Sequence, residues 1–166
     1  AQKNMGPAGT TLVVVKEDVL GKVSHQIPSM LDYKIHADKG SMFNTPPVFA
    51  VYTSMLTMEW LKNLGGIEAI EKENEKKAGL IYSEIDLNPL FKGFASNEDR
   101  STMNATFTLT NDIFKETFET MCAEAGINGI NGHRSVGGYR ASMYNALTLD
   151  SVATLVEVMS ELERKA

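Results

Sequence analysis

Three short clusters of residues could carry chemistry, and the first opens the chain. Lys3 lies in the string AQKNMGPAG, directly ahead of a tight glycine-rich loop. A lysine that such a loop shields from water can lose its proton and form a Schiff base with a carbonyl cofactor. The alternative is a solvated surface charge, which is the usual state of a lysine near the start of a chain.

The second cluster is the string FNTPP at 43–47. Asn44 and Thr45 present an amide and a hydroxyl just ahead of a stretch that is predicted to be helical from Val48. The N-terminus of a helix with polar groups in front of it attracts anions. A simple helix cap followed by a turn is the alternative for these two residues.

The third cluster is the string GHRSVGGYR at 132–140. Arg134 and Arg140 could each bind a carboxylate or a phosphate through two hydrogen bonds. The glycines let the backbone approach a ligand closely, and His133 adds a further polar group. This pattern indicates a small anionic ligand, and its two arginines fit one with two charges. The alternative is a basic loop on the surface.

The first half of the chain is predicted to hold one strand and two helices. The run TTLVVVK at 10–16 is typical of a strand that is buried on both faces, and residues 17–47 are rich in loop-forming glycine and proline. Apolar spacing predicts helices over 48–64 and 67–85. The first helix is apolar beyond a single stripe, so we expect it to be buried or shared with a partner. The charge run EKENEKK at 71–77 predicts a solvated face of the second helix.

The second half predicts two strands and two more helices. Alternation predicts a half-buried strand over 103–110, and apolar spacing predicts a helix over about 112–125. A glycine-rich loop leads to a strand at 139–144, and a last helix begins at a cap at Asp150 or Ser151. Helix, strand, helix, strand and helix therefore follow residue 66, which fits an α/β sandwich with its helices on one face of a sheet.

Cys122 is the one cysteine of the chain, next to the apolar face of the helix predicted over 112–125. We interpret it as a packed thiol rather than a nucleophile, because no histidine or lysine adjoins it. A single cysteine excludes an internal disulfide and a cysteine-based zinc site. It also favours a reducing compartment, so we expect a cytoplasmic protein.

The overall composition excludes several classes of protein. The chain has 166 residues, 43% hydrophobic and 22% charged, which is ordinary for a globular protein of one domain or slightly more. A net charge of −5 opposes general binding to nucleic acid or to anionic membranes. No apolar run approaches the roughly 18 residues that a membrane span needs, and the N-terminus has no signal-peptide pattern.

Taken together, the strings AQKNMGPAG, FNTPP and GHRSVGGYRAS resemble the phosphoserine aminotransferase family, whose members are pyridoxal-phosphate enzymes of fold type I. The resemblance runs along the whole chain and includes the strings NLGGIEAIEKENEKKAGLIYSEID and RSTMN. The HRSVGGYRAS string is the most discriminating, because related aminotransferases carry different substrate loops. The match is to the C-terminal part of the family chain, somewhat under half of it. We therefore expect a fragment, which also fits the absence of an initiator methionine.

The resemblance implies roles in cofactor binding for the first two clusters. Lys3 matches the Schiff-base lysine of the family, which also moves a proton between the substrate α-carbon and the cofactor. Asn44 and Thr45 match the pair that reaches the cofactor phosphate of the neighbouring subunit, which implies a homodimer.

For the third cluster, the resemblance implies substrate binding. His133 and Arg134 match residues near the phosphate of phosphoserine, and Arg140 matches the arginine that takes the substrate α-carboxylate. A substrate with two anionic ends needs two separated cationic groups, and this loop supplies them.

The resemblance also implies a division into domains and a limit on activity. Residues 1–65 would be the end of the large cofactor-binding domain with the interdomain helix, and residues 66–166 the small C-terminal α/β domain. In this family the aspartate that pairs with the pyridine nitrogen, the aromatic residue stacked on the ring and the main phosphate-binding turn precede the lysine. We therefore expect the full-length protein to bind pyridoxal phosphate, and this polypeptide alone to lack the cofactor and be inactive.

The implied activity is reversible amino transfer between phosphoserine and 2-oxoglutarate, giving 3-phosphohydroxypyruvate and glutamate, as in serine biosynthesis. One alternative is another enzyme of the same fold type, either a different small-substrate aminotransferase or a desulfurase. The HRSVGGYR loop opposes the first, and the packed setting expected for Cys122 opposes the second. The other alternative is a module without catalysis that binds small anions or dimerises.

Overall fold

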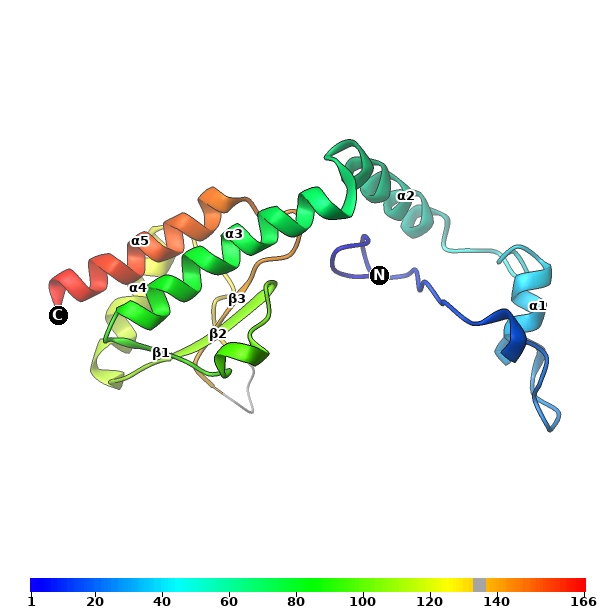
Figure 1. The fold of residues 1–166 in the computed structure, drawn as a ribbon, viewed down its shortest axis with the longest axis horizontal. Helices are drawn as coiled ribbons and strands as arrows, with labels where there is room; N and C mark the ends of the chain where they lie inside the picture. Colours follow the sequence, from blue (N-terminus) through cyan, green and yellow to red (C-terminus); the bar gives the residue numbers. More distant parts are fainter. Residues whose placement is uncertain (133–136) are drawn as a thin grey trace. The chain divides into compact units, whose positions relative to one another are not determined.

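The structure is a computed structural model that describes residues 1–132 and 137–166. The chain divides into two compact units, Ala1–Trp60 and Leu61–Ala166 (Figure 1). The assignment of residues 1–65 and 66–166 to two family domains stays a prediction.

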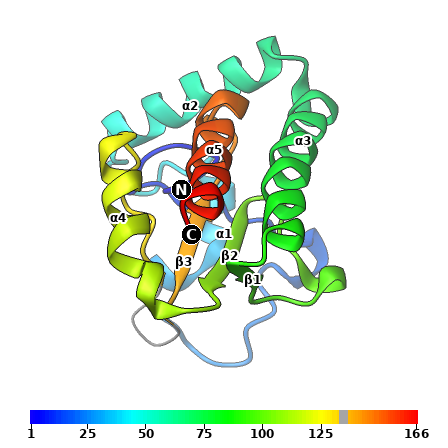
Figure 2. The same ribbon diagram turned by 90° about the vertical axis from the view of Figure 1, so that its left-hand side faces the viewer.

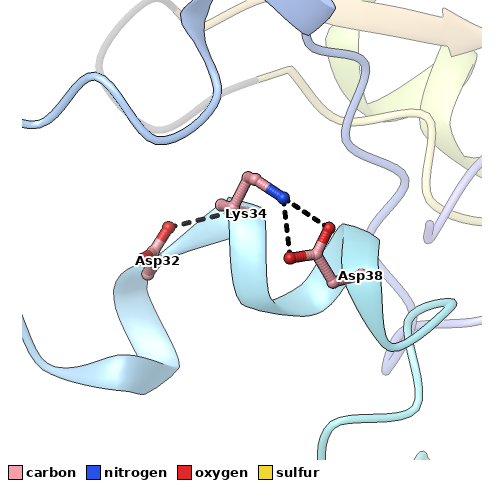
Figure 3. A network of polar contacts seen from close by, with 3 residues as sticks. All are labelled: Asp32, Lys34 and Asp38. Atoms are coloured by element: carbon pink, nitrogen blue, oxygen red, sulfur yellow. Dashed lines mark hydrogen bonds and ion pairs between the residues drawn. The ribbon is translucent and has the colours of Figure 1, made fainter.

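The first unit has little regular structure before helix α2 (Val48–Asn63). Two 3-10 turns and the short helix α1 (Tyr33–Asp38) interrupt the region that was expected to be loop. Asp32 caps α1 by accepting a hydrogen bond from the Lys34 backbone N–H at 2.9 Å, and Lys34 Nζ pairs with the Asp38 carboxylate at 2.6 Å (Figure 3). Both partners of this ion pair are about half exposed, so it adds only about 0–1 kcal/mol.

The prediction of a buried strand at 10–16 is wrong. The segment is not part of a strand, and Leu12, Val13 and Val14 are 66%, 45% and 88% exposed. A strand buried on both faces forms only with hydrogen-bonded neighbours, and the sheet of the described residues consists of three strands from the second unit. The predicted helix over 48–64 is confirmed within one residue, but its expected burial is not seen, since Ala50 alone is buried in it.

The second unit is a three-stranded antiparallel sheet with three helices. The strands are ordered β1-β2-β3, and Phe107 of β2 lies opposite both Gly93 and Tyr139. The three-residue strand β1 was not predicted, because it is too short to show alternation. The elements of this unit are α3 (Gly66–Leu87), β1 (Phe91–Gly93), β2 (Asn104–Leu109), α4 (Lys115–Glu124), β3 (Tyr139–Ser142) and α5 (Leu149–Lys165), with 3-10 turns at Asn97–Asp99 and Asp112–Phe114.

All three helices cover one face of this sheet, as predicted. Helix α5 lies between α3 and α4 and packs against both (Figure 2). The core between the layers holds a cluster of four aromatic rings with centroids 4.9–6.4 Å apart. These rings belong to Phe91, Phe107, Phe118 and Tyr139, all at most 4% exposed.

Helix α3 confirms its predicted inner face with two exceptions. Ile67 is 72% exposed, because it lies in the first turn, beyond the sheet. Lys77, the last residue of the charge run that was expected to be solvated, is 1% exposed. The remaining predicted inner residues are buried: Ile70, Asn74, Ala78, Ile81 and Ile85.

We expect Phe118→Ala to lower the free energy of unfolding by about 3–5 kcal/mol, because it leaves a cavity among three aromatic neighbours. Chemical denaturation followed by circular dichroism measures this loss. Ile113→Ala is the matched control, since Ile113 is 73% exposed and its loss should cost at most about 0.5 kcal/mol. Equal losses in both variants would contradict this account of the core.

We expect the Cys122 thiol to resist a disulfide reagent in the native protein at pH 8 and to react once the protein is unfolded. The side chain is 1% exposed, and burial raises its pKa to about 11 from an ordinary value near 9. The unfolded thiol releases its proton at lower pH than the folded one, so the free energy of unfolding should fall as pH rises from about 9 toward 11. Cys122→Ala should make that fall shallower. Rapid labelling of the native protein would contradict the packed-thiol interpretation.

Candidate functional site

The loop that follows Lys3 is held against the N-terminal half of α2. Gly6 has φ +132°, and a Cβ at this position would lie 2.7 Å from Ser54 Oγ, so only glycine fits the contact. A Cβ at Gly9 would likewise lie 3.1 Å from the Ala50 side chain. Lys3 itself is exposed at the start of this loop. The loop therefore anchors the chain next to Lys3, and the exposure of this residue fits the alternative of a solvated lysine rather than a shielded one.

Asn44 and Thr45 lie just ahead of the same helix and are exposed. The Asn44 side-chain amide donates a hydrogen bond to the Thr45 backbone oxygen at 3.1 Å, which tightens the turn. The first helical hydrogen bond runs from the Val51 N–H to the Pro47 oxygen at 3.1 Å, so the free N–H groups of the first turn follow these side chains directly. The loop that follows Lys3 and the Asn44–Thr45 turn thus both adjoin the N-terminal half of α2.

Two buried hydroxyls lie in the loop that follows Lys3 and in α2. Thr10 Oγ1 and Ser54 Oγ have no hydrogen-bond partner among the residues that the structure describes. A buried hydroxyl without a partner costs about 1–3 kcal/mol, so each could gain from a bound polar group.

Of the third cluster, the structure describes Gly132 and the residues from Gly137 onward. His133 and Arg134 lie outside the described residues. The Gly132 N–H donates a hydrogen bond to the Gly138 oxygen at 2.8 Å, which brings these two glycines together. Gly138 has φ +62°, and a Cβ there would lie 2.7 Å from the Phe107 backbone oxygen, so this close approach to β2 requires glycine.

Arg140 lies on the face of the sheet that carries no helix. Burial alternates along β3, so Arg140 and Ser142 are exposed while their neighbours are buried. Thr106 of β2 lies directly opposite Arg140, and the Arg140 N–H donates to the Ile130 oxygen at 2.7 Å on the other side. The strand is thus held on both edges at this residue. Arg140 can therefore present a guanidinium to a small anion from a fixed backbone position.

A cavity of about 300 Å³ borders Arg140 at the edge of the sheet. It is enclosed by the segment 125–130, by β3 and by the first turns of α5. Its walls combine apolar residues with polar ones, among which Ser142, Ser151 and Thr154 carry the hydroxyls. The concave surface is confined to the second unit and lies next to the one cationic side chain of β3.

Sequence reasoning missed two polar clusters of the second unit. In one, Arg100 binds the Asp86 carboxylate through two hydrogen bonds of 2.7 and 2.6 Å and lies over the Tyr82 ring at 4.6 Å. Arg100 lowers the pKa of Asp86, while burial raises the pKa of Tyr82. This cluster joins α3 to the loop before β2, and only the RSTMN string hinted at it. The other cluster surrounds Lys77.

Metal and membrane sites are not found in the parts of the chain that the structure describes. Residues 1–132 and 137–166 hold no group of three histidine, cysteine, aspartate or glutamate side chains that could bind a metal ion. In the same ranges, no helix combines the length and the apolar character that crossing a bilayer requires.

Known proteins match the chain along nearly its whole length. Phosphoserine aminotransferases of Flavobacterium psychrophilum and Flavobacterium johnsoniae are 68% and 63% identical to it over 165 residues. In each case the match covers 99% of this chain and 46% of the relative. The chain thus spans about half the length of the curated relatives it matches.

A solved structure and a family model agree with these relatives. The structure is one of phosphoserine aminotransferase with radiation damage of its Schiff base. It superposes with a TM-score of 0.92 at 46% identity, over 99% of this chain and 46% of that one. The model for aminotransferase class-V matches residues 1–155. This chain therefore belongs to the class-V aminotransferase family.

Proposed function

We propose that this chain is part of a phosphoserine aminotransferase that depends on pyridoxal phosphate. The observation that carries the proposal is the match, at up to 68% identity over 99% of the chain, to proteins of that name. The polar turn ahead of α2 and the guanidinium on β3 support it. The reaction is reversible transfer of an amino group between phosphoserine and 2-oxoglutarate, in the cytoplasm.

Lys3, Asn44 and Thr45 are the residues of this chain that would hold the cofactor. When bound, pyridoxal phosphate supplies an aldehyde for covalent attachment and a ring that accepts electrons from the substrate α-carbon. The Lys3 amine would be the attachment point for that aldehyde and would move a proton between the substrate α-carbon and the cofactor. Asn44 and Thr45 would donate hydrogen bonds to the phosphate of the neighbouring subunit's cofactor, aided by the N–H groups of the first turn of α2.

Arg140, His133 and Arg134 would hold the substrate. Arg140 fixes the α-carboxylate, which phosphoserine and glutamate share, and so orients the α-hydrogen. His133 and Arg134 receive the distal group, a phosphate in one substrate and a carboxylate in the other. In this proposal, His133 and Arg134 take one end of a small substrate and Arg140 takes the other.

The active assembly in this proposal is a homodimer, in which Asn44 and Thr45 reach the cofactor of the neighbouring subunit. The large exposed apolar side chains of α2, including Phe49 at 79%, support an assembly that covers this helix. Residues 1–65 would belong to the large domain and residues 66–166 to the small one. The desulfurase alternative is disfavoured, since Cys122 is buried and a buried neutral thiol is a poor nucleophile.

We expect residues 1–166 alone to stay colourless with pyridoxal phosphate and to show no transaminase activity. The reason is that the family partners of the pyridine ring lie in the half of the relatives that this chain does not match. The measurement is the visible spectrum after adding the cofactor, for these residues and for the complete protein. The complete protein should show a bound-cofactor band that Lys3→Ala abolishes. A Lys3-dependent band from the 166 residues alone would contradict this expectation.

We expect Arg140→Ala to impair the complete enzyme with every amino-acid substrate, and Arg134→Ala to impair it mainly with phosphoserine. Losing a desolvated, charge-assisted pair typically costs about 2–5 kcal/mol, here in transition-state binding. The measurement is kcat/KM for the phosphoserine and glutamate half-reactions. Arg164→Ala is the control, since this arginine is 70% exposed in its side chain. If Arg134→Ala slowed both half-reactions equally and Arg140→Ala slowed neither, the two assignments would be wrong.

A further inference from the structure

Lys77 of α3 is a buried cation that is bound entirely by backbone oxygens. The residue is 1% exposed. Its Nζ donates hydrogen bonds to the carbonyl oxygens of Met143, Tyr144 and Leu147 at 3.2, 3.1 and 3.0 Å. An ammonium has three donors, so this arrangement uses all of them.

The bonding pattern indicates that Lys77 shapes the backbone rather than pairs with an acid. Among the described residues, no carboxylate lies within ion-pair distance of its Nζ; Glu73, one turn earlier, acts on the charge from further away. Burial lowers the pKa of Lys77, and Glu73 partly opposes this. A buried charge is costly unless it is fully hydrogen-bonded, so the three oxygens must converge on this point.

A second side chain of α3 holds the same segment. Asn74 is 3% exposed and lies one turn before Lys77. Its Nδ2 donates a hydrogen bond to Asn145 Oδ1 at 2.9 Å. Two neighbouring polar side chains of one helix therefore hold residues 143–147 from the core side.

The segment that they hold continues directly from the strand that carries Arg140. Strand β3 ends at Ser142, and the Met143 N–H donates to the Met103 oxygen at 2.8 Å just before the Lys77 contacts begin. Helix α5 begins at Leu149, immediately after the same segment. The place where β3 stops is thus set from one side by Lys77.

We propose that Lys77 is a positioning residue for Arg140. By gathering the carbonyls of residues 143–147, it fixes the end of β3 and so the direction in which Arg140 leaves the open face of the sheet. Lys77 acts from the core through the backbone and does not reach the substrate itself. This inference rests on the proposed function, in which Arg140 binds the substrate α-carboxylate. A displacement of about 1 Å at such an anchor can cost on the order of a hundredfold in rate.

The test uses the complete enzyme with Lys77→Met, which keeps the length of the side chain and removes the charge and the donors. We expect KM for phosphoserine and for glutamate to rise on the order of tenfold or more, with a smaller change in kcat. A purely structural role would lower the amount of active enzyme, which reduces the apparent kcat and leaves KM unchanged. Lys77→Arg, which keeps charge and donors, should restore KM most of the way.

Matched control variants show whether the rise in KM is specific to Lys77 or follows the loss of any lysine of α3. Lys76→Met changes the adjacent residue, whose side chain is 60% exposed, and should leave KM and thermal stability unchanged. Asn74→Leu removes the second contact with the segment and should raise KM in the same direction as Lys77→Met, by a smaller factor. If Lys77→Met does not accumulate in folded form, Asn74→Leu and Lys77→Arg carry the test.

A measurement that needs no catalysis separates this inference from the proposed function. Amide hydrogen exchange should become faster at residues 139–147 in Lys77→Met and stay unchanged at 104–109 in β2. Unchanged exchange at 139–147, or a KM equal to that of the parent enzyme, would overturn the inference. If the parent enzyme does not transaminate phosphoserine, the proposed function fails, and the exchange result alone then decides whether Lys77 holds β3.

Discussion

In the described residues, helices cover only one face of the sheet around which the second unit is built. Three short antiparallel strands give a narrow surface, and α3, α5 and α4 occupy one side of it. The aromatic rings of Phe107 and Tyr139 point into that side, so the alternation of the strands sends Thr106 and Arg140 to the other. The same constraint that creates the core therefore leaves a cationic side chain on the open face, supported by a rigid strand.

The helices add a polar constraint to this apolar core. Lys77 and Asn74 replace two core positions of α3 with groups that bind the connection from β3 to α5. Apolar residues would fill the same space, but they could not bring backbone oxygens to one point. Buried polar groups of this kind specify one geometry because every alternative leaves donors without partners. The second unit thus combines packing by aromatic rings with three hydrogen bonds from one ammonium to the connection between β3 and α5.

Elements with many residues and one buried face could be predicted from the sequence, as α3, β2 and α5 show. Short elements could not: β1 has three residues and α1 has six, and each is less than two periods of the strand or helix pattern. Lys77 escaped prediction because it ends a run of mixed charges, and composition gives no signal for a lysine whose partners are carbonyls 66 to 70 residues away. Arg140 was singled out by its glycine-rich setting, while its place on the open face follows only from the register of the sheet.

The segment at 10–16 shows most clearly where a local sequence pattern fails to predict structure. Its valines have the composition of a buried strand, yet Val14 is 88% exposed and the segment pairs with no strand in the described sheet. β-branched residues favour an extended backbone, but a strand inside a sheet also needs neighbouring strands to hydrogen-bond with it. Contiguous exposed apolar residues of this kind mark surfaces that another part of a protein covers. Composition alone therefore does not make 10–16 a strand: without neighbouring strands to hydrogen-bond, its apolar side chains stay exposed in the described residues.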